Sequence, residues 1–271
     1  MLLNSTDDWD FYLHWTFNIS VPSLSNYNKT WLIENNCILG YLKLEWNGLT
    51  TYENILISPP YDNGELFLDD VLSGNVNISG NLTVSHNVKL TIQENTDLTF
   101  ASNTSLTING TLNAQGISSE PIVFTSSGTW DGIKLVNAGT STLEYCEIKN
   151  ASNGLYLDNS SPNITQCYIH NNSYDGIYMK GGSDPELKNN TMKNNSYNGI
   201  FCSDYSEPDL GDYSQSGSEG NNRITDNQTG INATSNSYVM AGIFYNQQVP
   251  RCYNNSIYNN TYWDAGASNA D

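Results

Sequence analysis

A repeat of about 22 or 23 residues runs through the second half of the sequence and restricts the fold more than any other feature. The stretch HNNSYDGIYM at 170–179 returns as KNNSYNGIFC at 193–202, and glycines mark each unit, at Gly132, Gly154, Gly176, Gly199 and Gly230. A unit of this size is too short for a crossover helix. It can bury an apolar face only by stacking on the next unit, so the repeat predicts a solenoid.

Within each unit apolar and polar residues alternate, which is the period of a β-strand. Two inward columns follow when the glycines are in phase: Ile133, Leu155, Ile177, Ile200 and Ile231, then Leu135, Leu157, Met179, Cys202 and Ala233. A second strand follows in each unit, and aligned prolines precede it at Pro162, Pro185 and Pro208. The chain is therefore predicted to be all-β, with parallel stacked strands.

These repeats resemble the right-handed parallel β-helix superfamily, in particular the Asn-x-Ile-x-Asn-Asn-x-x-x-Gly-Ile units of bacterial and archaeal surface and periplasmic proteins. The resemblance covers roughly residues 75–262 and implies a right-handed parallel β-helix, but a fold of this kind does not imply an activity. We predict the β-helix at 71–271, with an inserted loop near 203–222. Residues 1–70 are expected to form a β-rich cap, with or without a first coil, because CILGYLKL at 37–44 echoes upstream coils.

A long strand with one apolar face is predicted near the N-terminus, where apolar residues alternate without a break: Trp9, Phe11, Leu13, Trp15, Phe17, Ile19 and Val21. The end of a solenoid exposes core side chains and backbone groups. We therefore expect this strand to cap the coil stack, and its donation to a neighbouring molecule is the alternative.

An asparagine column follows the second strand of the units, at Asn150, Asn171, Asn194 and Asn259, with Asp226 in the same place. We predict that these residues form a ladder of side-chain amides at a tight turn. The four asparagines also begin Asn-x-Ser/Thr sequons, and a buried ladder amide cannot carry a glycan, so the two interpretations exclude each other here. Glycosylation is expected instead outside the main repeat, at Asn4, Asn18, Asn28, Asn81 and Asn103.

Composition restricts the partners. The chain has 28 acidic and 10 basic residues and a formal charge of −18, so a nucleic acid backbone would be repelled. No stretch approaches the roughly 18 apolar residues of a membrane span, so we expect no membrane insertion. About 17 sequons point to an extracellular or cell-surface glycoprotein, and the alternative is that an asparagine-rich repeat generates sequons by itself.

The five cysteines divide into two groups. Cys146, Cys167 and Cys202 fall in inward columns and are expected to pack as small apolar residues. A Cys146–Cys167 bridge is the alternative, but stacked parallel strands hold their Cβ atoms wider apart than a disulfide prefers. Cys37 and Cys252 are the better disulfide candidates, with each other or between molecules.

Motifs of the known β-helix enzymes are incomplete in this chain. Neither Arg223 nor Arg251 lies in an RxPxxR arrangement, and the NTD at 95–97 has no later GHG or RIK. The question of catalysis is left open, leaning towards none, and no cofactor is expected. Asp204, Asp209 and Asp212 in the inserted loop are a weak calcium candidate.

One outward column is aromatic. Tyr156, Tyr178 and Phe201 each follow the first inward column by one residue, so they should lie one coil apart on the outer surface. Such a row can be covered by the inserted loop or the N-terminal segment, can contact another protein, or can bind sugar rings.

These patterns together predict an extracellular structural protein of a cell-surface layer, sheath, filament or adhesin. It is expected to associate with itself or with other surface proteins. The alternative is a β-helix that binds or degrades carbohydrate.

Overall fold

The structure is a computed structural model, and it describes residues 64–211, 220–239 and 255–261, together with the backbone of strands at 2–4, 27–34, 37–46, 49–56 and 266–267. The chain divides into two compact units, Met1–Pro60 and Tyr61–Asp271. Every regular element in the described residues is a β-strand.

The first unit contains a four-stranded antiparallel sheet of β1 (Leu2–Asn4), β2 (Tyr27–Glu34), β3 (Cys37–Trp46) and β4 (Leu49–Leu56). The echo at 37–44 lies in β3, which pairs antiparallel with both of its neighbours. It is therefore no coil of the solenoid, and this part of the prediction is wrong. The predicted strand of Trp9, Phe11, Leu13, Trp15, Phe17 and Ile19 lies outside the described residues.

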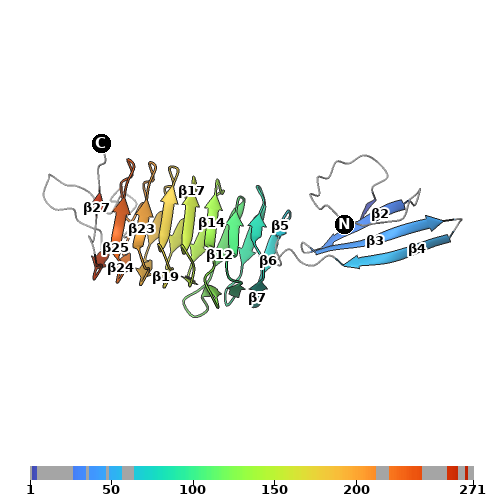
Figure 1. The fold of residues 1–271 in the computed structure, drawn as a ribbon, viewed down its shortest axis with the longest axis horizontal. Coiled ribbons are helices and arrows are strands. Elements are labelled where there is room, and N and C mark those ends of the chain that lie inside the picture. The colour runs from blue at the N-terminus through green and yellow to red at the C-terminus, as the bar shows by residue number, and fades with distance from the viewer. Residues whose placement is uncertain are drawn as a thin grey trace. The chain divides into compact units, whose positions relative to one another are not determined.

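The second unit is a parallel β-helix with three sheets, whose coils follow one another along its length (Figure 1). The nine-stranded sheet consists of β5 (Gly64–Leu66), β8 (Leu82–Val84), β11 (Ser105–Ile108), β14 (Gly132–Val136), β17 (Leu155–Asp158), β20 (Ile177–Lys180), β23 (Asn198–Cys202), β25 (Thr229–Ala233) and β27 (Gly266–Ala267). The six-stranded sheet consists of β6 (Asp70–Leu72), β9 (Lys89–Ile92), β12 (Thr111–Gln115), β15 (Thr142–Glu144), β18 (Asn163–Thr165) and β21 (Glu186–Lys188). The eight-stranded sheet consists of β7 (Asn75–Ile78), β10 (Asp97–Phe100), β13 (Ile122–Ser126), β16 (Cys146–Lys149), β19 (Tyr168–His170), β22 (Thr191–Lys193), β24 (Arg223–Thr225) and β26 (Ser256–Tyr258).

The inward columns predicted from the repeat are confirmed. Ile133, Leu155, Ile177 and Ile200 are in register along the nine-stranded sheet, and each is fully buried. Further towards the N-terminus the core contains a stacked pair, Phe100 and Trp130, whose ring centroids are 4.1 Å apart. The apolar interior therefore continues from coil to coil, because each coil covers the core of the one before it.

Most coils turn their corners at residues in the left-handed backbone conformation. In the coil of β17 to β19 these residues are Asn159, Gln166 and Asn171, with φ values of 49°, 58° and 55°. Asparagine tolerates this region better than most residues, because its short polar side chain can hydrogen-bond locally. The abundance of asparagine thus follows in part from the three sharp corners of each coil.

The residue after the corner points inward and hydrogen-bonds along the stack. Between the eight-stranded and nine-stranded sheets, Ala151 N donates to Asn172 Oδ1 (2.9 Å) and Asn172 Nδ2 donates to Asn195 Oδ1 (2.9 Å). This inner asparagine column continues through Asn227 and Asn260. A second column between the six-stranded and eight-stranded sheets contains Asn190, Asn222 and Asn255.

The ladder predicted at Asn150, Asn171, Asn194 and Asn259 is therefore wrong by one residue. These four residues occupy the left-handed corner, with φ values between 54° and 58°, and the side chains of the last three are exposed. The residue that follows each of the last three is the one that turns inward and joins the column.

The predicted inserted loop also begins later than expected. Residues 203–211 continue the coil, because Leu187 N donates to Asp209 O (2.8 Å) and Ser183 N donates to Ser206 Oγ (3.2 Å). Pro208 takes the same place in its coil as Pro185, since Asp209 N donates to Pro185 O. The extra residues thus lie after Gly211.

A third polar column contains a carboxyl group. Asp175 is 7% exposed, its Oδ1 accepts from Asn198 N (2.9 Å) and Asn198 Nδ2 (2.7 Å), and its own N donates to Asn153 Oδ1. Burial raises the pKa of Asp175, and the two hydrogen bonds from Asn198 only partly oppose this effect.

We expect Asn195→Ala to lower the free energy of unfolding by about 2 to 3 kcal/mol, because it removes the buried oxygen that accepts from both Asn172 N and Asn172 Nδ2. Asn194→Gly is the control, since glycine adopts the corner conformation without strain and the Asn194 side chain is exposed. Urea denaturation of both variants measures the difference. Equal losses would contradict the division of roles between the two asparagines.

Asp175→Asn is expected to raise Tm at pH 7 by about 2 to 4 °C, the shift that about 1 kcal/mol causes in a domain of this size. Below the usual carboxyl pKa, Asp175 is protonated in both the folded and the unfolded chain. As the pH rises through its raised folded pKa, the wild type loses stability that the amide keeps. Calorimetry between pH 3 and pH 7 should show the gain growing with pH. The matched variant Asp97→Asn removes the same charge from an exposed position, and an equal gain there would show that net charge alone is responsible.

Candidate functional site

The outer face of the nine-stranded sheet brings the three predicted aromatic residues together. Tyr156 pairs with Tyr178 and Tyr178 with Phe201 along β17, β20 and β23. The ring centroids are 5.2 Å and 5.1 Å apart, and the planes differ by 3° and 17°. We call these three residues the aromatic row. Each ring is half-buried, so one edge of the row remains available to solvent.

Charged side chains lie beside the aromatic row. Lys134 precedes Tyr156 in the same outward column, and Lys180 Nζ lies 5.7 Å from the centre of the Tyr156 ring and 3.2 Å from Asp158 Oδ2. Hydrogen bonds to Tyr156 and then to Asp158 raise the pKa of Lys180, so this cation stays charged at neutral pH. The row is thus a flat apolar strip with both signs of charge at its edge.

A second aromatic pair lies at the corner between the eight-stranded and nine-stranded sheets. Tyr174 and Tyr197 stack with their centroids 5.2 Å apart, and they are 52% and 48% exposed. Sequence reasoning missed this pair as a site, although both tyrosines occur in the repeated Asn-Asn-Ser-Tyr stretch.

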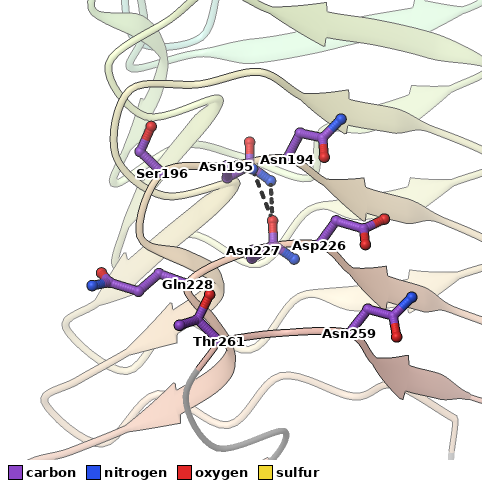
Figure 2. A pocket seen from close by; sticks show the side chains of 8 residues that line it. All are labelled: Asn194, Asn195, Ser196, Asp226, Asn227, Gln228, Asn259 and Thr261. Atoms are coloured by element: carbon purple, nitrogen blue, oxygen red, sulfur yellow. Dashed lines mark hydrogen bonds between the residues drawn. The ribbon is translucent and has the colours of Figure 1, made fainter.

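A polar recess of about 610 Å³ lies at the same corner, further along the stack (Figure 2). Figure 2 shows Asn194, Asp226 and Asn259 in one column and Ser196, Gln228 and Thr261 on the other side. The buried Asn195 and Asn227 lie between them and are joined by hydrogen bonds. The lining is made of amides, hydroxyls and one carboxylate, so the recess suits a ligand rich in hydroxyl groups.

A histidine–glutamate pair lies on the outer face of the eight-stranded sheet. His170 Nε2 is 2.9 Å from Glu147 Oε1, Lys149 Nζ is 2.8 Å from the same oxygen, and the Tyr168 ring stacks on His170. Burial alone would raise the pKa of Glu147, but hydrogen bonds from Lys149 and His170 lower it below its usual value. This carboxylate is thus held ionised and paired, which suits a structural contact better than general acid catalysis.

The calcium candidates do not converge in the part of the chain that is described. Asp204 is exposed at a left-handed corner, whereas Asp209 accepts from Gly211 N (2.8 Å) in a turn. Asp212 lies outside the described residues. No group of three or more His, Cys, Asp or Glu side chains suited to a metal ion occurs in the described ranges.

The three repeat cysteines are buried free thiols. Burial, and then a hydrogen bond with Cys167, raise the pKa of Cys146 well above its usual value. Burial raises the pKa of Cys202 to about 12. Such thiols are poor nucleophiles at neutral pH. The side chain of Cys37 and the whole of Cys252 lie outside the described residues.

Two of the predicted glycosylation sites can be placed. Asn103 is exposed at a left-handed corner with a φ of 60°, and Asn81 is exposed while its Oδ1 accepts from Ser105 N (2.9 Å). Asn4 and Asn28 fall in β1 and β2, whose side chains are not described, and Asn18 is outside the described residues. Within the described residues no helix is long and apolar enough to span a membrane.

Comparison with known proteins identifies the fold family. A search of curated proteins and a search of solved structures both gave no match. The family model described as a right handed beta helix region matches residues 73–212 and 123–269, which is more than half of the chain. The parallel coil stack agrees with this match. The chain therefore belongs to the right-handed β-helix family.

Proposed function

We propose that the protein is an extracellular, non-catalytic β-helix of a cell-surface layer, sheath, filament or adhesin, and that copies associate through the aromatic row. The observation that carries the proposal is the row itself, three stacked and half-exposed rings with Lys180 and Asp158 at the edge. A flat apolar strip of this kind gains free energy when a second surface covers it.

The charges favour a second copy of the chain as the partner. A contact between two copies about a two-fold axis is self-complementary, so Lys180 of one copy can face Asp158 of the other. Their pairing within one chain, at 3.2 Å on the surface, contributes little and is easily exchanged. The net charge of −18 repels two copies elsewhere, and Lys134 and Lys180 reduce that repulsion at the row.

The extracellular location is supported by the sequence. About 17 sequons occur in the chain, and Asn103, Asn171 and Asn194 begin sequons at exposed corners. Fractionation of cells that make the protein tests this location.

A second candidate function is carbohydrate binding. The specific observation is the exposed Tyr174–Tyr197 pair, at the same corner as the polar recess of Ser196, Gln228 and Thr261. The apolar face of a sugar ring packs on an aromatic ring, while amides and hydroxyls bind its hydroxyl groups.

Tyr178→Ser is expected to weaken self-association about tenfold or more, because it removes the middle ring of the row. Sedimentation velocity over a range of protein concentrations measures this change. Tyr205→Ser alters a tyrosine that is 67% exposed outside the row and should leave association unchanged. The proposal is contradicted if the wild type stays monomeric at every concentration. It is also contradicted if the Tyr178→Ser variant associates as strongly as the wild type.

A charge exchange gives a second test of the same contact. Lys180→Glu places two negative charges where the copies meet and should weaken association, whereas adding Asp158→Lys should restore it. Thermal denaturation of each variant checks that the coils remain folded. If the double variant associates no better than Lys180→Glu alone, the paired geometry is wrong.

For the second candidate, a glycan array probed with wild type and with Tyr174→Ser/Tyr197→Ser should show binding that the double variant loses. Tyr178→Ser serves as a control on the other aromatic surface. Absence of binding by the wild type to every glycan would remove this candidate. Polysaccharide turnover assays with and without calcium separate binding from degradation.

A further inference from the structure

Five Asn-Asn-Ser/Thr tripeptides occur in the sequence, and in four of them the structure describes all three residues. The first asparagine always adopts the left-handed corner conformation, with φ values of 55°, 55°, 54° and 57° at Asn171, Asn189, Asn194 and Asn259. The second asparagine always turns inward and joins a polar column, at Asn172, Asn190, Asn195 and Asn260. One tripeptide thus places two identical side chains in opposite environments.

The inward amide is fully used by the fold. Asn195 Oδ1 accepts from Asn172 Nδ2 (2.9 Å), and Asn195 Nδ2 donates to Asn227 Oδ1 (3.0 Å) and to Ile169 O (3.3 Å). The outward amide is not needed in this way, because Asp226 takes the same corner position in the next coil with a φ of 59°. The corner requires a backbone conformation and no amide group.

Along this corner, every coil that has the outward asparagine of a sequon also has the hydroxyl residue two positions later. The five stacked coils read Asn-Ala-Ser at 150–152, Asn-Asn-Ser at 171–173, Asn-Asn-Ser at 194–196, Asp-Asn-Gln at 226–228 and Asn-Asn-Thr at 259–261. Where the outward asparagine is replaced by aspartate, the third residue loses its hydroxyl as well. Ser173, Ser196 and Thr261 are all exposed, so burial does not require a hydroxyl at these positions.

There is room for an attached sugar at this corner. The polar recess of about 610 Å³ is lined by Asn194 and Asn259, with Asp226 and Gln228 between them (Figure 2). A first sugar ring on either asparagine can lie over this recess and hydrogen-bond to the carboxylate and amides of its lining.

We propose that Asn171, Asn194 and Asn259 are acceptor sites for N-linked glycosylation, a modification that rests on the proposed extracellular location. The donor is a polyprenyl phosphate-linked or pyrophosphate-linked oligosaccharide, and a membrane-bound transferase is the partner. The Nδ2–C1 bond to the first sugar forms, the bond from C1 to the phosphate oxygen breaks, and the amide proton leaves with the lipid phosphate. The reaction precedes coil closure or occurs at the exposed corner, and the fold tolerates the product there because the side chain points outward.

The chain contains its own negative control. Asn227-Gln228-Thr229 is also a sequon, but Asn227 is 2% exposed, its Oδ1 accepts from Asn195 Nδ2 and its Nδ2 donates to Met192 O (3.1 Å). A glycan on Asn227 would remove these bonds and could not fit inside the coil. The folded protein should therefore carry no glycan at this sequon.

The test uses the full chain secreted from eukaryotic cells behind a cleavable leader, followed by glycopeptide mass spectrometry with enzymatic release in ¹⁸O-labelled water. We expect glycans at Asn171, Asn194 and Asn259 and none at Asn227. Asn171→Asp, which keeps the corner conformation as Asp226 does, and Ser173→Ala, which leaves the asparagine in place, should each remove the mass of one glycan. Asn172→Ala places in the inner column the residue that Ala151 already provides there, leaves the sequon of Asn171 intact and should keep that glycan.

Secreted, folded protein without glycans at all three asparagines overturns the inference, whatever the location of the protein in its own cells. A glycan at Asn227 in folded protein overturns the structural argument as well. Fractionation of native cells is a separate measurement. Protein found inside the cell would remove the proposed extracellular function, while the result from the secreted chain still decides whether these corners accept a glycan.

Discussion

The corner hydrogen bond between coils is the interaction on which the rest of the structure depends. Strand ladders satisfy the backbone of the three sheets, but a left-handed corner turns the next N–H along the stack, where no strand carbonyl is in place to accept it. A side-chain oxygen from the following coil takes over, as when Asn195 N donates to Asn227 Oδ1 (2.9 Å) and Ser160 N donates to Ser183 Oγ (3.1 Å). Because a buried donor without a partner costs about 1 to 3 kcal/mol, a corner linked in this way favours an inward residue with an oxygen in the following coil.

This requirement divides the residues of each coil into two sets, those whose type the fold fixes and those that are free to vary. Inward strand residues must be apolar, and an inward corner residue must accept a hydrogen bond wherever such a bond joins two coils, so neither set can vary with function. Outward strand residues and outward corner residues meet neither condition. The aromatic row and the exposed Tyr174–Tyr197 pair both belong to the free set. In both proposed functions recognition is therefore a property of the outer columns, with the coil stack holding them at a fixed spacing.

Much of the fold could be predicted from the sequence, because the glycine spacing and the alternation of Ile177 and Tyr178 specify strands that stack in phase. The predicted ladder lies one residue too early for a physical reason. Both corner residues are asparagine, so the residue type does not show which of the two adopts the left-handed conformation. Neighbouring coils distinguish the two columns, because the inner column contains Ala151 and the outer column contains Asp226. An apolar residue at one position of a column indicates that the whole column faces the interior. The antiparallel pairing of β3 had no such signal, because alternation alone does not distinguish a coil from a hairpin.

The repeated asparagine pair also explains why the strands, and not the corners, must fix the register of the coils. A slip of one residue would move Asn194 inward in place of Asn195, and the column would still contain an amide of the same size. Because side chains alternate strictly along a strand, the same slip would turn Ile200 outward and bring Phe201 into the core. The packing of the core would then be lost. The inward isoleucines and outward rings therefore resist the slip that the asparagines allow. Since register does not depend on the first asparagine, selection is free to use that position for chemistry at the surface, and Asp226 shows that the corner accepts such a change.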